Sequence, residues 1–214
     1  MELFLIRHGQ SLNNAADVSQ RVPDAPLTDV GLQQASRCAQ WVPSLELSRL
    51  VSSPFLRALQ TTDPIRKATG LRPEVQIDLH EVGGCYSGHL PEEQVGLPGM
   101  TRSQMAAKFP GFRIAENIDG DGWWACKPFE SMEQARDRAA GCFRRTVDAF
   151  AHTAERVAYV MHGDYLRCLL NCFHDASLET PFNTSVSKIT ITPDEARIEY
   201  YNRVDHLDAE LLTI

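Results

Sequence analysis

Two short apolar segments, each followed at once by a histidine and a glycine, constrain the fold more than any other feature of this sequence. One is Glu2 to Ile6, which leads into Arg7-His8-Gly9, and the other is Val157 to Met161, which leads into His162-Gly163. Both have the length of a buried strand and are too short for a buried helix. Ligands of open α/β sheets bind outside the carboxyl ends of the strands. We therefore expect both histidines at that edge of one sheet.

The segments around these two motifs alternate between expected strands and expected helices. Two more short strands are predicted at Leu50-Val51 and at Val75 to Ile77, because Ser, Pro or Gly bounds each of them. Capping residues and apolar periodicity predict helices over Thr28 to Trp41, Pro54 to Thr69, Met132 to Ala151 and Tyr165 to Phe173.

The end of the chain, Ser185 to Thr192 with Arg197 to Tyr201, predicts a terminal hairpin. Strands that alternate with helices are typical of an α/β fold, here a doubly wound, mostly parallel sheet flanked by helices. Pro64 falls inside the second predicted helix and is expected to kink it.

The length of 214 residues, of which 43% are apolar, predicts one domain that spans residues 1–214. Residues 85–129 interrupt the alternation because they are rich in glycine, proline and aromatic residues. They contain one short helix candidate, Arg102 to Lys108, and we interpret them as a cap inserted into the domain. The adjacent Trp123 and Trp124 are expected to pack in the cap interior rather than to stack on a substrate.

The charge balance restricts the classes of partner. With 28 acidic and 21 basic residues the formal net charge is -7, which opposes binding to nucleic acid or to an anionic membrane surface. The apolar run near the N-terminus, Leu3 to Ile6, is only four residues long, far shorter than a signal sequence or a membrane span. We therefore expect a cytoplasmic protein. Because the net charge is negative, any phosphate-binding site must be a local cluster of basic side chains.

The six cysteines predict neither a disulfide framework nor a metal site. They form no CxxC pair and no tight cluster with histidine at the spacing of metal ligands. Cys168 and Cys172 lie four residues apart on a predicted helix, where buried thiols are a commoner use than a metal or redox pair. We expect free thiols, no bound metal and no cofactor.

Four blocks of residues, taken in order, resemble a known family. Leu5-Ile6-Arg7-His8-Gly9-Gln10-Ser11, followed by Asn14, resembles the RHG motif of the histidine phosphatase superfamily, which is also called phosphoglycerate-mutase-like. The resemblance continues in the family's order and at compatible spacings, and it covers most of the chain except the cap. Its further blocks are Asp24-Ala25-Pro26-Leu27-Thr28 with Gly31 and Ala35, Ser52-Ser53-Pro54 with Arg57-Ala58 and Gln60-Thr61, and His162-Gly163.

The resemblance implies a role for each polar residue of these blocks. His8 would be the residue that is phosphorylated, Arg7, Arg57 and His162 would bind the transferring phosphoryl group, and Asn14 would assist. An imidazole attacks phosphorus only when neutral, and neighbouring guanidinium groups lower its pKa below the usual value of about 6.5. The same cations would stabilise the equatorial oxygens of the transition state. A helix that starts after Gly9 would aim N–H groups at the anion.

The leaving oxygen needs a proton, and in this family a carboxylic acid soon after the third strand usually supplies it. Glu81 is the candidate, because Leu79-His80-Glu81-Val82-Gly83-Gly84 loosely resembles the family's Leu-x-Glu and glycine-containing stretch. An ordinary surface role for Glu81 is the alternative interpretation. His80 is a rival proton donor.

Three functions are compatible with these residues. The leading hypothesis is a metal-independent phosphatase that hydrolyses a small phosphorylated substrate through a phosphohistidine. A phosphoglycerate-type mutase would use the same residues, but mutases of this family continue the acid motif as Glu-Arg-His-Tyr-Gly, where this chain has Glu81-Val82-Gly83-Gly84-Cys85. The third is a catalytically silent relative that binds a phosphate group. The sequence predicts neither the substrate nor the oligomeric state.

Overall fold

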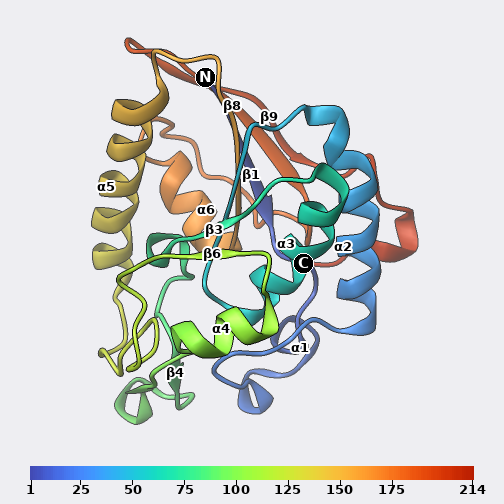
Figure 1. Cartoon of the computed structure of the whole chain (residues 1–214). Coiled ribbons are helices and arrows are strands. Elements are labelled where there is room, and N and C mark those ends of the chain that lie inside the picture. The colour runs from blue at the N-terminus through green and yellow to red at the C-terminus, as the bar shows by residue number, and fades with distance from the viewer.

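The computed structural model describes residues 1–214 and is built around a seven-stranded sheet of order β6-β3-β2-β7-β1-β8-β9 (Figure 1). Its first five strands in that order are parallel, whereas β8 and β9 are antiparallel to their neighbours. This confirms the predicted mostly parallel α/β sheet and the terminal hairpin. The strands are β1 (Glu2–Arg7), β2 (Arg49–Ser52), β3 (Glu74–Val75), β6 (Arg113–Ile114), β7 (Arg156–Met161), β8 (Val186–Ile191) and β9 (Ala196–Arg203).

Helices cover both faces of the sheet, as Figure 1 shows. The helices α2 (Asp29–Trp41) and α3 (Leu56–Thr69) pack on one face, and α5 (Met132–Phe150) and α6 (Gly163–Leu170) pack on the other. Alternate residues of β1 explain this arrangement, because Phe4 belongs to the core beneath α2 and α3 and Leu5 to the core beneath α5 and α6. A strand buried on both faces has a continuous apolar run rather than an alternating one.

The register of β1 and β7 brings the two histidine motifs together. Arg7 pairs with Met161 at the end of this parallel ladder, so His8 and His162 leave the sheet side by side. The N–H of His8 donates to the Met161 carbonyl at 2.9 Å, which extends the ladder by one bond.

The predicted helix boundaries are confirmed where a cap signals them. Thr28 accepts a hydrogen bond from the Gly31 N–H at 3.0 Å, and Ser131 accepts one from the Gln134 N–H at 3.2 Å. Gly70 ends α3 in the left-handed conformation, with φ of 72°.

Three predicted boundaries were wrong. The helix α6 begins at Gly163 rather than Tyr165 and ends at Leu170, because His162 is its extended N-cap. Strand β3 stops at Val75, and Ile77 already belongs to a 3-10 turn, Ile77–Leu79, that leads the chain toward Glu81. The helix α3 begins at Leu56, two residues after Pro54, and it runs to Thr69 without interruption at Pro64.

The helix expected directly after Gly9 begins later and is shorter than a full helix. The helix α1 (Leu12–Ala15) is a single turn, and Ser11 is its N-cap. The N–H of Asn14 is taken up by Ser11, whose carbonyl and hydroxyl both accept it. This turn therefore does not aim that N–H group at an anion.

Residues 85–129 hold β4 (Tyr86–Ser87), β5 (Val95–Gly96), α4 (Arg102–Lys108) and β6. The predicted helix over Arg102 to Lys108 is confirmed. The segment has its own apolar core, which includes the buried Trp123 and Trp124 and extends to Phe55 and Val75 of the main domain. Because β6 pairs with β3, the segment also supplies the edge strand of the central sheet. It is thus packed onto the main domain rather than joined to it by a linker.

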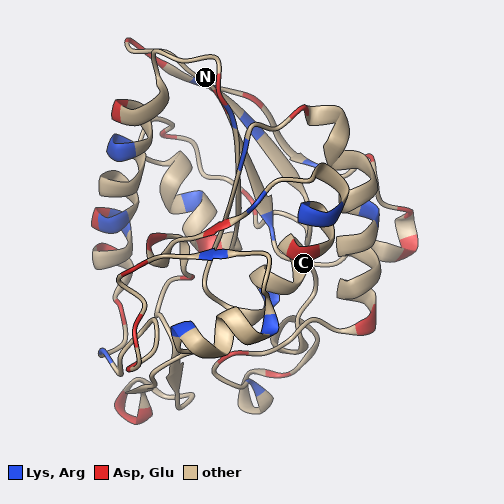
Figure 2. Ribbon diagram, in the orientation of Figure 1, with Lys and Arg blue, Asp and Glu red and all other residues tan.

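Charged residues of both signs are interspersed along α5 and along the loops (Figure 2). No helix combines the length and the apolar character that a membrane crossing requires.

Candidate active site

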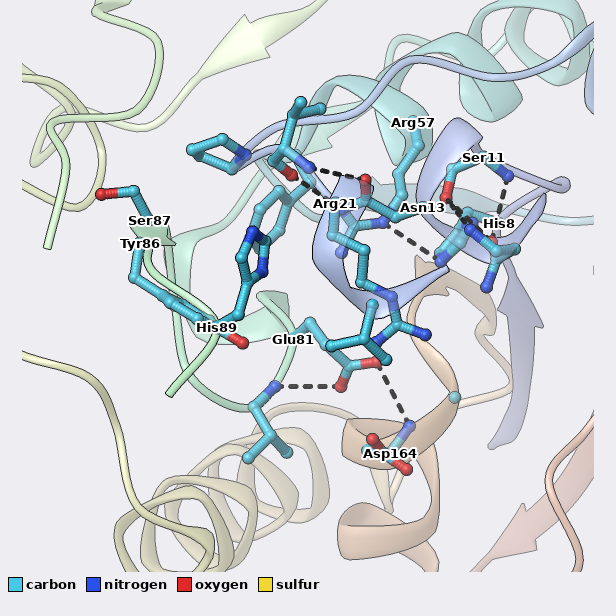
Figure 3. A pocket seen from close by; sticks show the side chains of 18 of the residues that line it. His8, Ser11, Asn13, Arg21, Arg57, Glu81, Tyr86, Ser87, His89 and Asp164 are labelled. Carbon is cyan, nitrogen blue, oxygen red and sulfur yellow. Dashed lines mark hydrogen bonds between the residues drawn. The ribbon is translucent and has the colours of Figure 1, made fainter. Parts of the chain in front are cut away.

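A cavity of about 450 Å³ opens at the carboxyl edge of the parallel strands (Figure 3). Its walls come from the end of β1, the segment 11–23, the start of α3, the segment 81–89 and the start of α6. Arg7, His8 and Arg57 all line it. His162 lies behind His8, with their ring centroids 5.0 Å apart. The structure therefore brings the four residues together at one end of the sheet.

The hydrogen bonds of His8 determine which ring nitrogen carries the proton. Nδ1 lies 2.7 Å from the carbonyl oxygen of Gly9, which can only accept, so Nδ1 is the protonated nitrogen. Nε2 accepts a hydrogen bond from Nε of Arg57 at 3.2 Å and carries no proton of its own. The lone pair of a neutral imidazole is thus held at Nε2, beside a guanidinium group.

Burial keeps this imidazole neutral. His8 is 3% exposed, and burial together with the positive charges of Arg57 and Arg7 lowers its pKa well below the usual value. His8 is therefore an unprotonated base at neutral pH.

Arg57 is held from two sides. Its guanidinium lies over the Phe55 ring, 4.1 Å from the ring centroid, and it is nearly buried. Asp24 accepts the Leu56 N–H at 2.9 Å and contributes a negative charge close to Arg57. This carboxylate also supplies the side-chain cap that Phe55, at the start of α3, does not provide.

Arg7 donates from Nη1 to the carbonyl of Pro181, whereas its buried Nε has no hydrogen-bond partner in the protein. A Cβ atom at Gly163 would lie 3.3 Å from this Nε, so glycine leaves space for the guanidinium at the start of α6. A buried donor without a partner costs free energy unless a ligand satisfies it.

His162 shows the same combination of one fixed and one free nitrogen. Its Nε2 lies 2.7 Å from the hydroxyl oxygen of Ser53, and its buried Nδ1 has no partner. Burial, followed by the charge of Arg57, lowers its pKa well below the usual value. The unpartnered Nε–H of Arg7 can donate to an anion, and Nδ1 of His162 can do so in the tautomer in which Nε2 accepts from the Ser53 hydroxyl.

Asn14 lines the cavity, and its amide orientation is set locally. Its Oδ1 accepts from the Ser11 N–H at 3.0 Å and from the Ser11 hydroxyl at 2.9 Å. The amide NH₂ is left as a hydrogen-bond donor for a ligand.

Glu81 lines the cavity, and its carboxylate is hydrogen-bonded to N–H groups at the N-terminus of α6. Its Oε1 accepts the N–H groups of Val82 and Tyr165, both at 2.9 Å, and its Oε2 accepts the Asp164 N–H at 3.3 Å. Burial, and secondarily the negative charge of Asp164, raises the pKa of Glu81 although these N–H groups oppose the shift. Glu81 is therefore not an ordinary surface acid.

His80 cannot supply the proton from its position. It is 2% exposed and is not part of the cavity wall. Its Nδ1 lies 2.8 Å from the Glu81 carbonyl, and burial, followed by the charge of Arg138, lowers its pKa to about 3. The ring packs against Trp123, Trp124 and Tyr165, so His80 is a neutral core residue.

A buried ion pair supports the Glu81 loop from behind. Arg138 on α5 forms two hydrogen bonds with the carboxylate of Glu130, at 2.8 and 2.6 Å. Its Nη1 also donates to the carbonyls of Asp78 at 2.6 Å and His80 at 3.1 Å. One guanidinium therefore binds the backbone on the N-terminal side of Glu81.

Sequence patterns did not indicate several residues that complete the site. Asn183 donates to the His8 carbonyl at 3.1 Å across 175 positions of sequence, and no local motif marks it. Asp164 and Arg21 also line the cavity. Ser53, the partner of His162, belongs to a block that resembles the family, and that was the only signal that could have identified it.

The described chain has no group of three or more His, Cys, Asp or Glu side chains arranged to hold a metal ion. All six cysteines are free thiols, as expected. Of the two for which burial was expected, Cys168 is buried and Cys172 is exposed.

The fold and this arrangement are those of an enzyme of phosphoryl transfer. Residues 3–204 match the family model of the histidine phosphatase superfamily (branch 1), and the chain belongs to that superfamily, whose members are phosphatases or mutases. Probable phosphoglycerate mutases GpmB from Yersinia pestis and Yersinia pseudotuberculosis are 30% identical to it over 172 residues, which are 80% of this chain and 74% of those relatives.

Solved structures share the fold at lower identity. YhfR from Bacillus stearothermophilus is 24% identical, with a TM-score of 0.67 over 96% of this chain and 98% of that one. A mycobacterial glucosyl-3-phosphoglycerate phosphatase is 23% identical, with a TM-score of 0.64 over 95% of this chain and 99% of that one. A phosphoserine phosphatase mutant from Entamoeba histolytica, in complex with phosphoserine, is 21% identical, with a TM-score of 0.62 over 96% and 98% of the two chains.

Proposed function

We propose that this protein is a phosphatase that hydrolyses a small phosphomonoester through a phosphohistidine on His8. The observation that supports it most directly is the tautomer of His8. The Gly9 carbonyl keeps the ring proton on Nδ1, so Nε2 carries an unprotonated lone pair. This lone pair attacks phosphorus once Arg57 Nε, which donates to it here, donates to the phosphoryl group instead. Burial of the ring and the charges of Arg57 and Arg7 lower its pKa, which keeps that lone pair unprotonated at neutral pH.

In the first step, the lone pair of His8 Nε2 forms a bond to phosphorus while the bond from phosphorus to the ester oxygen breaks. Arg7 and Arg57 bind the equatorial oxygens, and the amide of Asn14 on the cavity wall completes the anion site. His162 is not part of the wall, but it lies against His8 and its buried Nδ1 has no protein partner, so it binds the phosphoryl group from behind His8. Protonated Glu81, on another wall of the cavity, donates its proton to the leaving oxygen (Figure 3).

In the second step, water attacks the phosphohistidine. The Glu81 carboxylate produced by the first step accepts a proton from that water, the bond from phosphorus to nitrogen breaks, and phosphate leaves with His8 neutral again. Each residue thereby returns to its starting protonation state. No metal ion takes part in either step.

A phosphoglycerate mutase is the second candidate, because the Yersinia relatives carry that name. A mutase must protect its phosphohistidine from water until the intermediate has reoriented. Here the rim residues Arg21 and His89 are exposed to solvent, and the segment after Glu81 differs from the mutase motif. Both features favour hydrolysis. The same preparation should release phosphate from phosphomonoesters faster than it exchanges 2- and 3-phosphoglycerate, and exchange that outruns release by orders of magnitude would make it a mutase.

Replacement of the nucleophile tests the proposal. His8→Ala should abolish turnover of every phosphomonoester. It should also abolish transfer of a radioactive phosphoryl group from the substrate to the protein. A chelator should leave the wild-type rate unchanged. His152→Ala, a change at an exposed histidine outside the cavity, is the control and should retain full activity. Undiminished turnover by His8→Ala would refute the phosphohistidine. If the wild-type protein binds phosphate but hydrolyses none of a set of phosphomonoesters, it is a catalytically silent relative that only binds a phosphate group.

A further inference from the structure

The contact that fixes the ring proton of His8 is itself held by a side chain that has no part in the steps above. The Gly9 carbonyl, which accepts from Nδ1 of His8 at 2.7 Å, belongs to the same peptide group as the N–H of Gln10. That N–H donates to Oε1 of Gln34 at 2.7 Å. Because a peptide group is planar and rigid, the hydrogen bond at its N–H end sets the direction of the carbonyl at its other end.

The side chain of Gln34 is buried in α2, and its amide orientation is determined by its partners. It is 0% exposed. Its Nε2 donates to the carbonyl of Leu211 at 2.7 Å and to Oγ1 of Thr213 at 2.8 Å. A carbonyl only accepts, so the NH₂ group must face Leu211 and Oε1 must face Gln10. Gln34 therefore cannot turn away from Gln10 without losing two further hydrogen bonds.

The loop that contains Gly9 and Gln10 packs backbone against backbone on the first turn of α2. A Cβ atom at Gly31 would lie 2.0 Å from the Gln10 carbonyl oxygen, and one at Gly9 would lie 2.6 Å from the Gly31 carbonyl oxygen. The N–H of Thr28 donates to the same Gln10 carbonyl at 2.9 Å. Glycine at both positions permits this close approach, which brings the Gln10 N–H within reach of Gln34.

The direction of the Gly9 carbonyl matters most while the bond to phosphorus forms. In this structure Arg57 also holds the His8 ring, through Nε2, but it donates to the phosphoryl group once substrate is bound. As Nε2 bonds to phosphorus the ring becomes positively charged, and the hydrogen bond from Nδ1 to the Gly9 carbonyl becomes charge-assisted. An acceptor that is already in place stabilises this charge without reorganisation.

We propose that Gln34 is a positioning residue that holds the Gly9 carbonyl on Nδ1 of His8 and thereby keeps Nε2 directed at phosphorus. It acts through the peptide between Gly9 and Gln10, and it is not part of the cavity wall. This inference rests on the proposed phosphohistidine mechanism and adds a residue of α2 to it. Substrate binding should therefore not depend on Gln34, whereas the rate of phosphoryl transfer to His8 should.

Replacement of the amide by an apolar side chain of similar length tests this role. Gln34→Met offers no strong acceptor to the Gln10 N–H. Phosphoryl transfer from an ester to His8, measured in a single turnover, should slow by about 10- to 100-fold, which is what one hydrogen bond to a charged group contributes. The inhibition constant of inorganic phosphate should change by less than about threefold. Gln33→Met alters the exposed neighbour on α2 and should change neither quantity.

A measurement without substrate observes the contact itself. In NMR spectra of the isotopically labelled wild type, the Nδ1 proton of His8 should resonate downfield, as a hydrogen-bonded proton does, and should exchange slowly with water. In Gln34→Met it should move upfield and exchange at least about tenfold faster. In Gln33→Met it should match the wild type. A role of Gln34 in packing alone would lower stability without changing this proton.

Two further variants of Gln34 separate the acceptor from the rest of the side chain. Gln34→Glu keeps an oxygen that accepts the Gln10 N–H in either protonation state, so phosphoryl transfer should stay within about fivefold of the wild-type rate. Gln34→Asn withdraws the acceptor by one methylene group and should lose at least about fivefold. This shorter variant serves as the test where Gln34→Met does not fold.

An unchanged Nδ1 proton in folded Gln34→Met or Gln34→Asn would overturn the proposal. A wild-type rate in either variant would overturn it as well, as would a loss in Gln34→Glu equal to that in Gln34→Met. The proposed phosphatase function fails separately, through turnover that survives His8→Ala, and the Nδ1 proton would still report whether Gln34 holds the Gly9 carbonyl.

Discussion

At the scale of single residues, burial shifts the pKa values of two groups in the cavity in opposite directions. It lowers the pKa of His8 and raises the pKa of Glu81, because a dry environment disfavours the charged form of either group. Burial thus favours the neutral imidazole of His8 and the protonated carboxyl group of Glu81. This is the pair of states that nucleophilic attack with an acid-assisted leaving group requires.

The acid role of Glu81 predicts a dependence on the leaving group. Glu81→Gln keeps the side-chain oxygen that accepts the N–H groups of Val82 and Tyr165, but it cannot transfer a proton. Hydrolysis of an alkyl phosphate should fall by about 10²- to 10⁴-fold, whereas nitrophenyl phosphate, whose leaving group needs little protonation, should lose less than about tenfold. Steady-state rates on both esters decide it, and an equal loss would remove the acid role from Glu81.

The same pair predicts the shape of the pH profile. The kcat/KM for an alkyl phosphate should decline as the pH rises through the raised pKa of Glu81 in the free enzyme, because the proton to be donated is lost. The decline on the acidic side, which protonation of His8 causes, should occur well below pH 6.5. In Glu81→Gln the alkaline decline should disappear. A decline that persists unchanged in this variant would assign that limb to another group.

At the scale of elements, two helices hold the acid in place. The first N–H groups of α6 bind the Glu81 carboxylate, and Arg138 of α5 binds the carbonyls of Asp78 and His80. Arg138 also lies over the Tyr165 ring, 3.8 Å from its centroid, so it connects α5 to α6. The position of Glu81 therefore depends on how these helices pack.

Removal of Arg138 should destabilise the protein strongly. Arg138→Met leaves the Glu130 carboxylate, 8% exposed, without its partner, and should lower the free energy of unfolding by about 3 kcal/mol. Adding Glu130→Gln should recover part of that loss, which a double-mutant cycle in urea measures. Arg145→Met is the control, because its ion pair with Asp78 is exposed and should contribute less than about 1 kcal/mol. Strict additivity of Arg138→Met and Glu130→Gln would show that the pair is not coupled.

At the scale of the whole molecule, the buried histidines make stability depend on pH. His80 has a pKa of about 3 in the folded protein, against about 6.5 in the unfolded chain. Below pH 6.5 the unfolded chain binds a proton that the folded protein does not, so the free energy of unfolding falls as the pH falls. From pH 7 to pH 5, His80 alone should remove about 2 kcal/mol. The depressed pKa values of His8 and His162 act in the same direction.

Urea unfolding at pH 7 and pH 5 measures this dependence. His80→Asn, whose amide can replace the Nδ1 donor to the Glu81 carbonyl, should lose about 2 kcal/mol less between the two pH values than the wild type, whatever its stability at pH 7. His152→Asn changes an exposed histidine and should keep the wild-type dependence. The same pH dependence in His80→Asn and in the wild type would contradict the prediction.

The sequence by itself determined the features that depend on local pattern. The apolar runs of β1 and β7, the caps Thr28 and Ser131, and Gly70 were all predictable, because strand burial and helix termination follow from a few neighbouring residues. The four ordered blocks that begin with Arg7-His8-Gly9 likewise indicated phosphoryl-transfer chemistry, through their resemblance to the histidine phosphatase superfamily. The two-residue strands were less predictable, because β6 exists only where the long segment 85–129 returns to pair with β3.

Only the tertiary structure decided how the side chains of the site are held. The contacts that hold the site join residues 58 to 175 positions apart in the sequence. They are Ser53 with His162, Asn183 with the His8 carbonyl, and Arg138 with the His80 carbonyl next to Glu81. It also decided that His80 is a neutral core residue and that Arg21 lies at the mouth of the cavity. Such contacts follow no periodicity along the chain. They arise when packing removes water from polar groups, which must then find partners wherever the fold has brought them.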